Sequence, residues 1–220
     1  MSDNSQLTTH DSRPLIKVCG MREPGNIGQI AELKPDYMGF IFQPVSSRYV
    51  GRDPDPSVFE RVPPEIGKIG VFVNQDPGLL IEQCEKYGFF AAQLHGTETP
   101  EYCRTVRESG LAVIKAFSLH DTFDFNIMEA YTSAAAYFLF DTKGKLAGGT
   151  GLKFNWEILD RYRFPVPFFL SGGIGPDDVK QLKTIRHPQF SGIDINSGFE
   201  IAPAMKDTEA VRRFMEEIRG

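Results

Sequence analysis

The sequence predicts an α/β protein that forms a single (β/α)8 barrel, the TIM barrel architecture, and three observations support this. First, eight strand-like runs alternate with eight helix-like runs between residues 15 and 220. Second, the sequence shows no linker or low-complexity stretch in that range. Third, the residues that could carry chemistry cluster where strands end, and the ends of parallel strands share one face. We assign residues 15–220 to one barrel domain and residues 1–14 to a disordered, polar lead-in.

The bulk composition is that of an ordinary globular protein. Its 220 residues are 41% hydrophobic and carry a net charge of −5, which argues against nucleic-acid and membrane partners. No apolar run is as long as a membrane span, and residues 1–14 lack the apolar segment of a secretory signal. The three cysteines are irregularly spaced without a CxxC pair, which favours a reducing, cytoplasmic location over a disulfide framework or zinc site.

The first half of the chain supplies four strand–helix pairs. Pro24 and Asn26 open the first helix after a short apolar strand. The third strand is rich in β-branched residues, and Pro77 stands at the start of the helix that follows it. The expected strands are residues 15–18, 36–42, 69–73 and 90–94, and the expected helices are residues 26–33, 56–62, 79–87 and 100–108.

The second half supplies four more pairs. The second strand of this half, residues 137–140, is almost without polar residues, which is typical of a strand buried on both faces. Phe154 and Trp156 bracket the start of the helix that follows it. The expected strands are residues 112–117, 137–140, 166–170 and 192–195, and the expected helices are residues 124–132, 155–161, 176–183 and 207–218.

A long glycine-rich loop, residues 142–153, interrupts this second half. Loops of this length in compact domains are usually functional. The run Gly148-Gly149-Thr150-Gly151 does not open a strand–helix unit in the dinucleotide register, and no acidic residue ends a suitable next strand. We therefore expect a mobile lid or a hydroxyl-binding loop rather than a nucleotide site.

Two glycine turns follow the last two strands. Gly172 and Gly173 end the seventh strand, and Asn196, Ser197 and Gly198 end the eighth. Glycines let backbone N–H groups approach an anion, and the loops after strands seven and eight are the usual phosphate site of this barrel class. A single such turn would be only a tight turn, but two at these strands favour phosphate binding.

Cys19 and Asp141 each follow a strand directly. A thiol at the mouth of a barrel could serve as a nucleophile or base if neighbouring positive charge lowers its pKa. A carboxyl group beside a highly apolar strand could act as a general acid. The alternatives are a small buried cysteine and a carboxylate that accepts hydrogen bonds from loop backbone.

Arg48 and His95 complete the candidate site. Arg48 is the one charged residue between residues 43 and 51, and a guanidinium can hold a carboxylate or phosphate with two parallel bonds. The alternative is a solvated loop arginine. His95 either faces the ligand or bonds to backbone. No second histidine or acid stands at metal-ligand spacing from His95, so we expect no metal.

These residues lie within motifs that follow one another in a fixed order. The motifs are Lys17-Val18-Cys19-Gly20-Met21, Gly39-Phe40-Ile41-Phe42, Ser46-Ser47-Arg48, Gly70-Val71-Phe72-Val73, Gln93-Leu94-His95-Gly96, Phe140-Asp141-Thr142, Gly148-Gly149-Thr150-Gly151, Ser171-Gly172-Gly173-Ile174 and Asp194-Ile195-Asn196-Ser197-Gly198-Phe199-Glu200. The ordered set spans residues 16–207 and resembles the phosphoribosylanthranilate isomerase family of tryptophan biosynthesis.

The resemblance implies a cofactor-free Amadori rearrangement of N-(5′-phosphoribosyl)anthranilate to 1-(o-carboxyphenylamino)-1-deoxyribulose 5-phosphate. It implies that Asp141 protonates the ribose ring oxygen and that Cys19 removes the C2′ proton. It also implies that Arg48 holds the anthranilate carboxylate and that the glycine turns hold the phosphate. Two departures stand out: Asn196 replaces a usual serine, and Ala204 stands where glycine is common.

Two other interpretations remain open. A different phosphate-binding barrel enzyme, such as an indole-glycerol-phosphate synthase or a histidine-pathway isomerase, is one. The synthase would need a catalytic lysine constellation, and Lys17, Lys115 and Lys143 lie near strand ends without replacing Cys19 and Asp141. A non-catalytic phosphosugar-binding module is the other, and it would need only the glycine turns. We expect a monomer, because no exposed apolar helix is evident.

Overall fold

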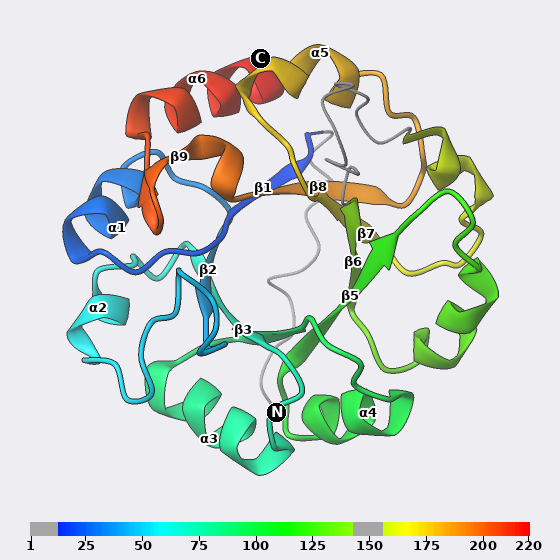
Figure 1. The fold of residues 1–220 in the computed structure, drawn as a ribbon, viewed down its shortest axis with the longest axis horizontal. Coiled ribbons are helices and arrows are strands. Elements are labelled where there is room, and N and C mark those ends of the chain that lie inside the picture. The colour runs from blue at the N-terminus through cyan, green and yellow to red at the C-terminus, as the bar shows by residue number, and fades with distance from the viewer. Residues whose placement is uncertain (1–12, 143–155) are drawn as a thin grey trace.

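Eight parallel strands close into a barrel, as the sequence predicts (Figure 1). The computed structural model describes residues 13–142 and 156–220. The strands follow one another in chain order, and the first strand also pairs with the last. Their bounds are β1 Leu15–Val18, β2 Tyr37–Ile41, β3 Gly67–Phe72, β4 Ala91–Leu94, β5 Ala112–Leu119, β6 Tyr137–Thr142, β7 Phe168–Ser171 and β8 Phe190–Ile195.

Two predicted segments fall largely outside the described residues. Of the lead-in at residues 1–14, only residues 13 and 14 are described. Of the glycine-rich loop at residues 142–153, only Thr142 is described, at the end of β6. The predictions of a disordered lead-in and of a mobile or hydroxyl-binding loop therefore stay predictions.

Helices surround the barrel (Figure 1). The α-helices are α1 Pro24–Ala31, α2 Ser57–Glu60, α3 Pro77–Tyr87, α4 Pro100–Glu108, α5 Val179–Leu182 and α6 Thr208–Arg219. The 3₁₀ helices are η2 Phe125–Tyr131, η3 Trp156–Arg161, η4 Pro176–Asp178 and η5 Ser197–Phe199. Side-chain caps start several helices: the Asp76 carboxylate accepts from Leu79 N–H at α3, and the Thr99 hydroxyl accepts from Tyr102 N–H at α4.

Three of the predicted helices are present but are not continuous α-helices. The segment predicted at 124–132 forms the 3₁₀ helix η2, the described part of the segment predicted at 155–161 forms the 3₁₀ helix η3, and the segment predicted at 176–183 divides into η4 and α5. In η2 the buried side chains Phe125 and Met128 are three residues apart, the spacing that a three-residue turn places on one side. In η4 the Asp178 carboxylate accepts from Gly175 N–H and fixes a tight first turn.

A short hairpin after β8 was not predicted. It consists of β9 Glu200–Ala202 and β10 Met205–Lys206, which pair antiparallel. Ala204 in its turn has φ of 66°, the left-handed region that favours glycine. This conformation fits the glycine that the family resemblance leads us to expect at this position, and the hairpin brings Glu200 and Lys206 back toward Asn196.

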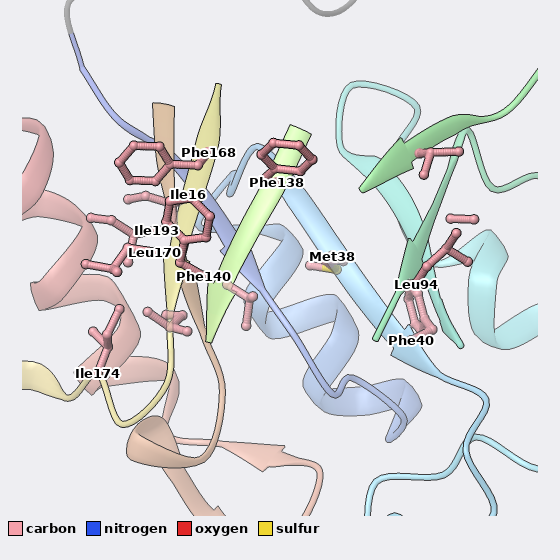
Figure 2. Packing of buried hydrophobic residues seen from close by; sticks show 14 of the residues in the cluster. Ile16, Met38, Phe40, Leu94, Phe138, Phe140, Phe168, Leu170, Ile174 and Ile193 are labelled. Carbon is pink, nitrogen blue, oxygen red and sulfur yellow. The ribbon is translucent and has the colours of Figure 1, made fainter. Parts of the chain in front are cut away.

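The apolar core has two layers, as alternating side chains of the strands require. Outward-facing residues pack between the strands and the helices, among them Phe138, Phe140 and Phe168 (Figure 2). Inward-facing residues such as Leu139 and Phe169 fill the barrel interior. Both sets on β6 are buried, which accounts for the nearly continuous apolar sequence of that strand.

The barrel interior turns polar toward the carboxyl ends of the strands. Lys17 lies two residues beyond the inward-facing Leu15, so both side chains point into the barrel. Gln93, Asp141 and Asp194 occupy similar positions on other strands. Lys17, Gln93 and Asp194 are all buried. A layer of charged and amide groups therefore forms the floor of the site. Among the described residues, no helix is long and apolar enough to cross a membrane.

Candidate active site

A cavity of about 370 Å³ opens at the carboxyl ends of the strands. All of the candidate site residues taken from the sequence line it. These are Cys19, Arg48, His95, Asp141, Gly172, Gly173, Asn196, Ser197 and Gly198. A larger hollow of about 970 Å³ lies on the outside, between η3 and α5, and none of the candidate residues lines it. We therefore place the candidate active site at the barrel mouth.

Asp141 lies at the end of a short chain of hydrogen-bonding groups. His95 Nε2 is 3.2 Å from Asp141 Oδ2, and Gln93 Nε2 is 2.9 Å from His95 Nδ1. With the amide in this orientation, Gln93 donates to Nδ1, so a neutral His95 carries its proton on Nε2 and donates to Asp141. His95 thus orients the carboxyl group of Asp141, which lines the cavity. The hydrogen-bond partners of the His95 ring are side chains, not backbone groups.

Cys19 lies beside a buried ion pair. Lys17 Nζ donates to Asp194 Oδ1 at 2.9 Å, and both side chains are excluded from solvent. Burial raises the pKa of the Cys19 thiol above its usual range, and the Lys17 ammonium is the strongest opposing influence. From the sequence, the thiol could act as a nucleophile or base if neighbouring positive charge lowers its pKa. The positive charge is present, but burial outweighs it.

Arg48 is not a solvated loop arginine. Its Nε and Nη2 groups bond to the Glu200 carboxylate at 2.5–3.0 Å, and its side chain is only 21% exposed. The hydrogen bond with Glu200 raises the pKa of Arg48. Burial alone would raise the pKa of Glu200, but hydrogen bonds from Arg48 and Lys206 hold it below its usual range. Arg48 Nη1 makes one long hydrogen bond, 3.5 Å to Ser47 Oγ, and has a second N–H group for another acceptor.

Asn196 extends this network. Lys206 Nζ donates to Asn196 Oδ1 at 2.8 Å and to Glu200 Oε1 at 2.7 Å. A Cβ atom on Gly20 would lie 2.7 Å from Asn196 Oδ1 and 2.6 Å from Arg48 Cδ, so both side chains pack directly over that glycine. Asn196 therefore serves in this structure as an acceptor for a buried lysine, a role for which an amide oxygen is suited.

The two glycine turns pack against each other. Gly172 and Gly173 have φ of 90° and 66°, values that residues other than glycine rarely adopt. A Cβ atom on Gly198 would lie 2.2 Å from the Ile174 carbonyl oxygen, so only glycine fits there. Within the described residues the Gly173 N–H has no hydrogen-bond acceptor. This geometry offers backbone donors to an anion in the cavity.

Sequence reasoning missed the roles of five site residues: Lys17, Gln93, Asp194, Glu200 and Lys206. A signal existed for the first three, because a polar residue two positions before a strand end points the same way as that end. No comparable signal existed for Glu200 and Lys206, whose positions depend on the hairpin. Among the described residues, no group of three histidine, cysteine or acidic side chains forms a metal-binding cluster.

Comparison with known proteins agrees with this geometry. The family model for N-(5′-phosphoribosyl)anthranilate (PRA) isomerase matches residues 16–217. The N-(5′-phosphoribosyl)anthranilate isomerase of Phocaeicola vulgatus is 46% identical over 205 residues, which cover 93% of this chain and 98% of the relative.

Two solved structures are similar over nearly their full lengths. One, from Thermotoga maritima, is described as monomers generated from a dimeric phosphoribosylanthranilate isomerase, with 29% identity and a TM-score of 0.75. The other is such an isomerase in complex with reduced 1-(o-carboxyphenylamino)-1-deoxyribulose 5-phosphate, with 28% identity and a TM-score of 0.74. Each match covers 94% of this chain and 99% of the other. By its sequence, its barrel and its match to the family model, the chain belongs to the N-(5′-phosphoribosyl)anthranilate isomerase family.

Proposed function

We propose that this chain converts N-(5′-phosphoribosyl)anthranilate to 1-(o-carboxyphenylamino)-1-deoxyribulose 5-phosphate, an Amadori rearrangement of tryptophan biosynthesis. The observation that carries the mechanism is that Cys19, directly after β1, and Asp141, near the end of β6, line one cavity together with both glycine turns. An acid and a base on one substrate are what this reaction requires. Family membership supports the choice of substrate.

The first step opens the ribose ring. Asp141, as the carboxylic acid, donates its proton to the ring oxygen. The bond between C1′ and that oxygen breaks, and the nitrogen lone pair forms a C1′=N iminium ion. The His95 Nε2–H group bonds to Asp141 Oδ2 and stabilises the carboxylate that this transfer leaves.

The second step transfers a proton from carbon. Cys19, as the thiolate, takes the C2′ proton, and the electron pair of that C–H bond forms a C1′=C2′ double bond while the iminium nitrogen becomes neutral. The product is an enolamine, which tautomerises to the ketone. A moderate base is sufficient because the adjacent cation acidifies the C2′ proton.

Arg48 and the glycine turns hold the two ends of the substrate in this proposal. The Nη1 side of Arg48 takes the anthranilate carboxylate, because Glu200 already occupies the Nε and Nη2 groups. The Gly173 N–H and its neighbours take the phosphate. With both ends fixed, the ring oxygen and C2′ lie between the acid and the base, and positioning of this kind accounts for much of enzymatic rate enhancement.

The experiment is turnover of N-(5′-phosphoribosyl)anthranilate generated in situ, followed by loss of its fluorescence, in metal-free buffer with chelator. We expect consumption by wild type and a loss of about 10²–10⁴-fold or more in Cys19→Ala and Asp141→Asn. Cys103→Ala is the matched control, because Cys103 is a buried thiol outside the cavity. Near-normal turnover in either site variant would remove that residue from the mechanism. Binding without turnover by wild type would favour the phosphosugar-binding module.

We further propose that the enzyme is a cytoplasmic monomer. The cysteines Cys19, Cys84 and Cys103 are all free, which fits a reducing compartment. Because the Thermotoga maritima relative is described as dimeric, the oligomeric state needs its own measurement. Light scattering coupled to gel filtration should give the mass of one 24.7 kDa chain, and twice that mass would contradict the proposal.

A further inference from the structure

The ion pair beneath Cys19 joins the first and last strands of the barrel. Lys17 on β1 lies opposite Asp194 on β8 in the strand register, and their hydrogen bond is 2.9 Å long. Cys19 continues the same ladder, because its N–H donates to the Ile195 carbonyl at 2.8 Å. Since side chains two residues apart on a strand share a face, Lys17 and Cys19 both point into the barrel mouth.

Gly39 shows how closely the thiol and the ammonium approach each other. A Cβ atom on this β2 glycine would lie 2.8 Å from Cys19 Sγ and 3.0 Å from Lys17 Nζ. The sulfur and the nitrogen can therefore be separated by no more than the sum of those two lengths. At that range, with both side chains buried, an ammonium interacts strongly with a thiolate.

Four charged groups act on the sulfur, and they differ in sign. Lys17 and Lys206 favour the thiolate, and Asp194 disfavours it. Arg48, which packs over the neighbouring Gly20, also interacts electrostatically with Cys19. Lys17 has the largest influence among them. Asp194 in turn raises the pKa of Lys17 even though burial works against it, so the lysine stays charged beside the thiol.

We propose that Lys17 is a positioning residue for the reaction: its ammonium, fixed by the hydrogen bond to Asp194, stabilises the Cys19 thiolate in the orientation that accepts the C2′ proton. This inference deepens the proposed function and rests on the role of Cys19 as the base. Gly39 contributes by leaving room for the sulfur and the ammonium to meet. Lys17 touches no reacting atom in this scheme and acts through Cys19.

The test is the rate of Cys19 alkylation by iodoacetamide as a function of pH, read by mass spectrometry of the Cys19 peptide. Compared with wild type, we expect alkylation in Lys17→Met/Asp194→Asn to be slower by about tenfold or more at neutral pH. Lys17→Met alone should be slower still, because Asp194 then opposes the thiolate without compensation. The double variant leaves no unpaired buried charge, so it stays folded if the single variant does not.

The matched control is Lys115→Met/Glu98→Gln. Lys115 and Glu98 form another buried pair, 3.0 Å apart, and neither acts on Cys19. This variant should alkylate within about twofold of wild type, and its circular dichroism reports the cost of losing a buried pair. Wild-type alkylation in a folded Lys17→Met/Asp194→Asn protein would overturn the inference.

Turnover measurements separate this inference from the proposed function. The expected result is that kcat/KM of Lys17→Met/Asp194→Asn reaches its plateau at higher pH than that of wild type, in step with alkylation. If alkylation shifts while the kcat/KM profile does not, the pairing of Lys17 with the thiolate stands and Cys19 loses its role as the base. If Cys19→Ala is inactive while alkylation is unaffected by the loss of Lys17, the proposed function stands and this inference fails.

Discussion

At the scale of single residues, ion pairs within the protein fix the charged side chains of the site in the absence of substrate. Arg48 is an example, because its Nε and Nη2 groups donate hydrogen bonds to Glu200, which also accepts a hydrogen bond from Lys206. An unpaired arginine on a loop has many rotamers, and fixing one beforehand lowers the entropy lost on binding. In the proposed function, Glu200 thus holds Arg48 in place for the substrate carboxylate without contacting the substrate itself.

Replacing Glu200 tests this role. In Glu200→Gln the amide cannot pair with both Arg48 and Lys206 as an anion, so Arg48 becomes mobile. We expect KM for N-(5′-phosphoribosyl)anthranilate to rise about tenfold, equivalent to about 1.4 kcal/mol, with a smaller change in kcat. Glu209→Gln, at an exposed glutamate on α6, is the control and should leave both constants unchanged. A fall in kcat at constant KM would assign Glu200 to the chemical step instead.

At the scale of elements, the strand ends were predictable and the helices less so. All of the candidate residues from strand ends meet in one cavity, because parallel strands in a barrel must end on one face. The types of η2 and η3 and the β9–β10 hairpin were not predictable, because local packing and one left-handed alanine, Ala204, decide them. Glu200 and Lys206 depend on that hairpin, so their part in the site could not be inferred either.

The contact between the two glycine turns gives a prediction at this scale. In Gly198→Ala the new methyl group would collide with the Ile174 carbonyl and push the turns apart. Because the proposed phosphate site lies between them, affinity for inorganic phosphate should fall at least tenfold in a titration, and kcat/KM should fall with it. Gly25→Ala is the control: its Cβ would meet nothing within 4 Å, and alanine favours the helix α1. Unchanged phosphate affinity in Gly198→Ala would place the phosphate elsewhere.

At the scale of the whole molecule, the fold class was predictable from the sequence because eight strand–helix units in one chain leave few other arrangements. The structure also confirms the expectation that the apolar strand β6 is buried on both faces. The register in which β1 and β8 pair could not be predicted from the sequence. The structure gives this register, which places Lys17 opposite Asp194.

Phe140 tests how far stability depends on the layer between barrel and helices. Its buried ring packs against Phe125, Tyr162 and Phe168 (Figure 2 shows Phe140 and Phe168). We expect Phe140→Ala to lower the free energy of unfolding in urea by about 3–5 kcal/mol. Leu79→Ala is the control, because Leu79 is exposed and should change the free energy of unfolding by less than about 0.5 kcal/mol. A small loss in Phe140→Ala would mean that neighbouring rings collapse into the space.

The hydrogen bond between Lys17 and Asp194 also marks a stage of folding. It joins residues 177 positions apart, so it forms only when the last strand has docked against the first. An enzyme whose base depends on this pair gains its activity at barrel closure and not before. Recovery of turnover during refolding therefore reports when β1 and β8 pair and the barrel closes. Fluorescence and circular dichroism report the earlier formation of the individual helices and strands.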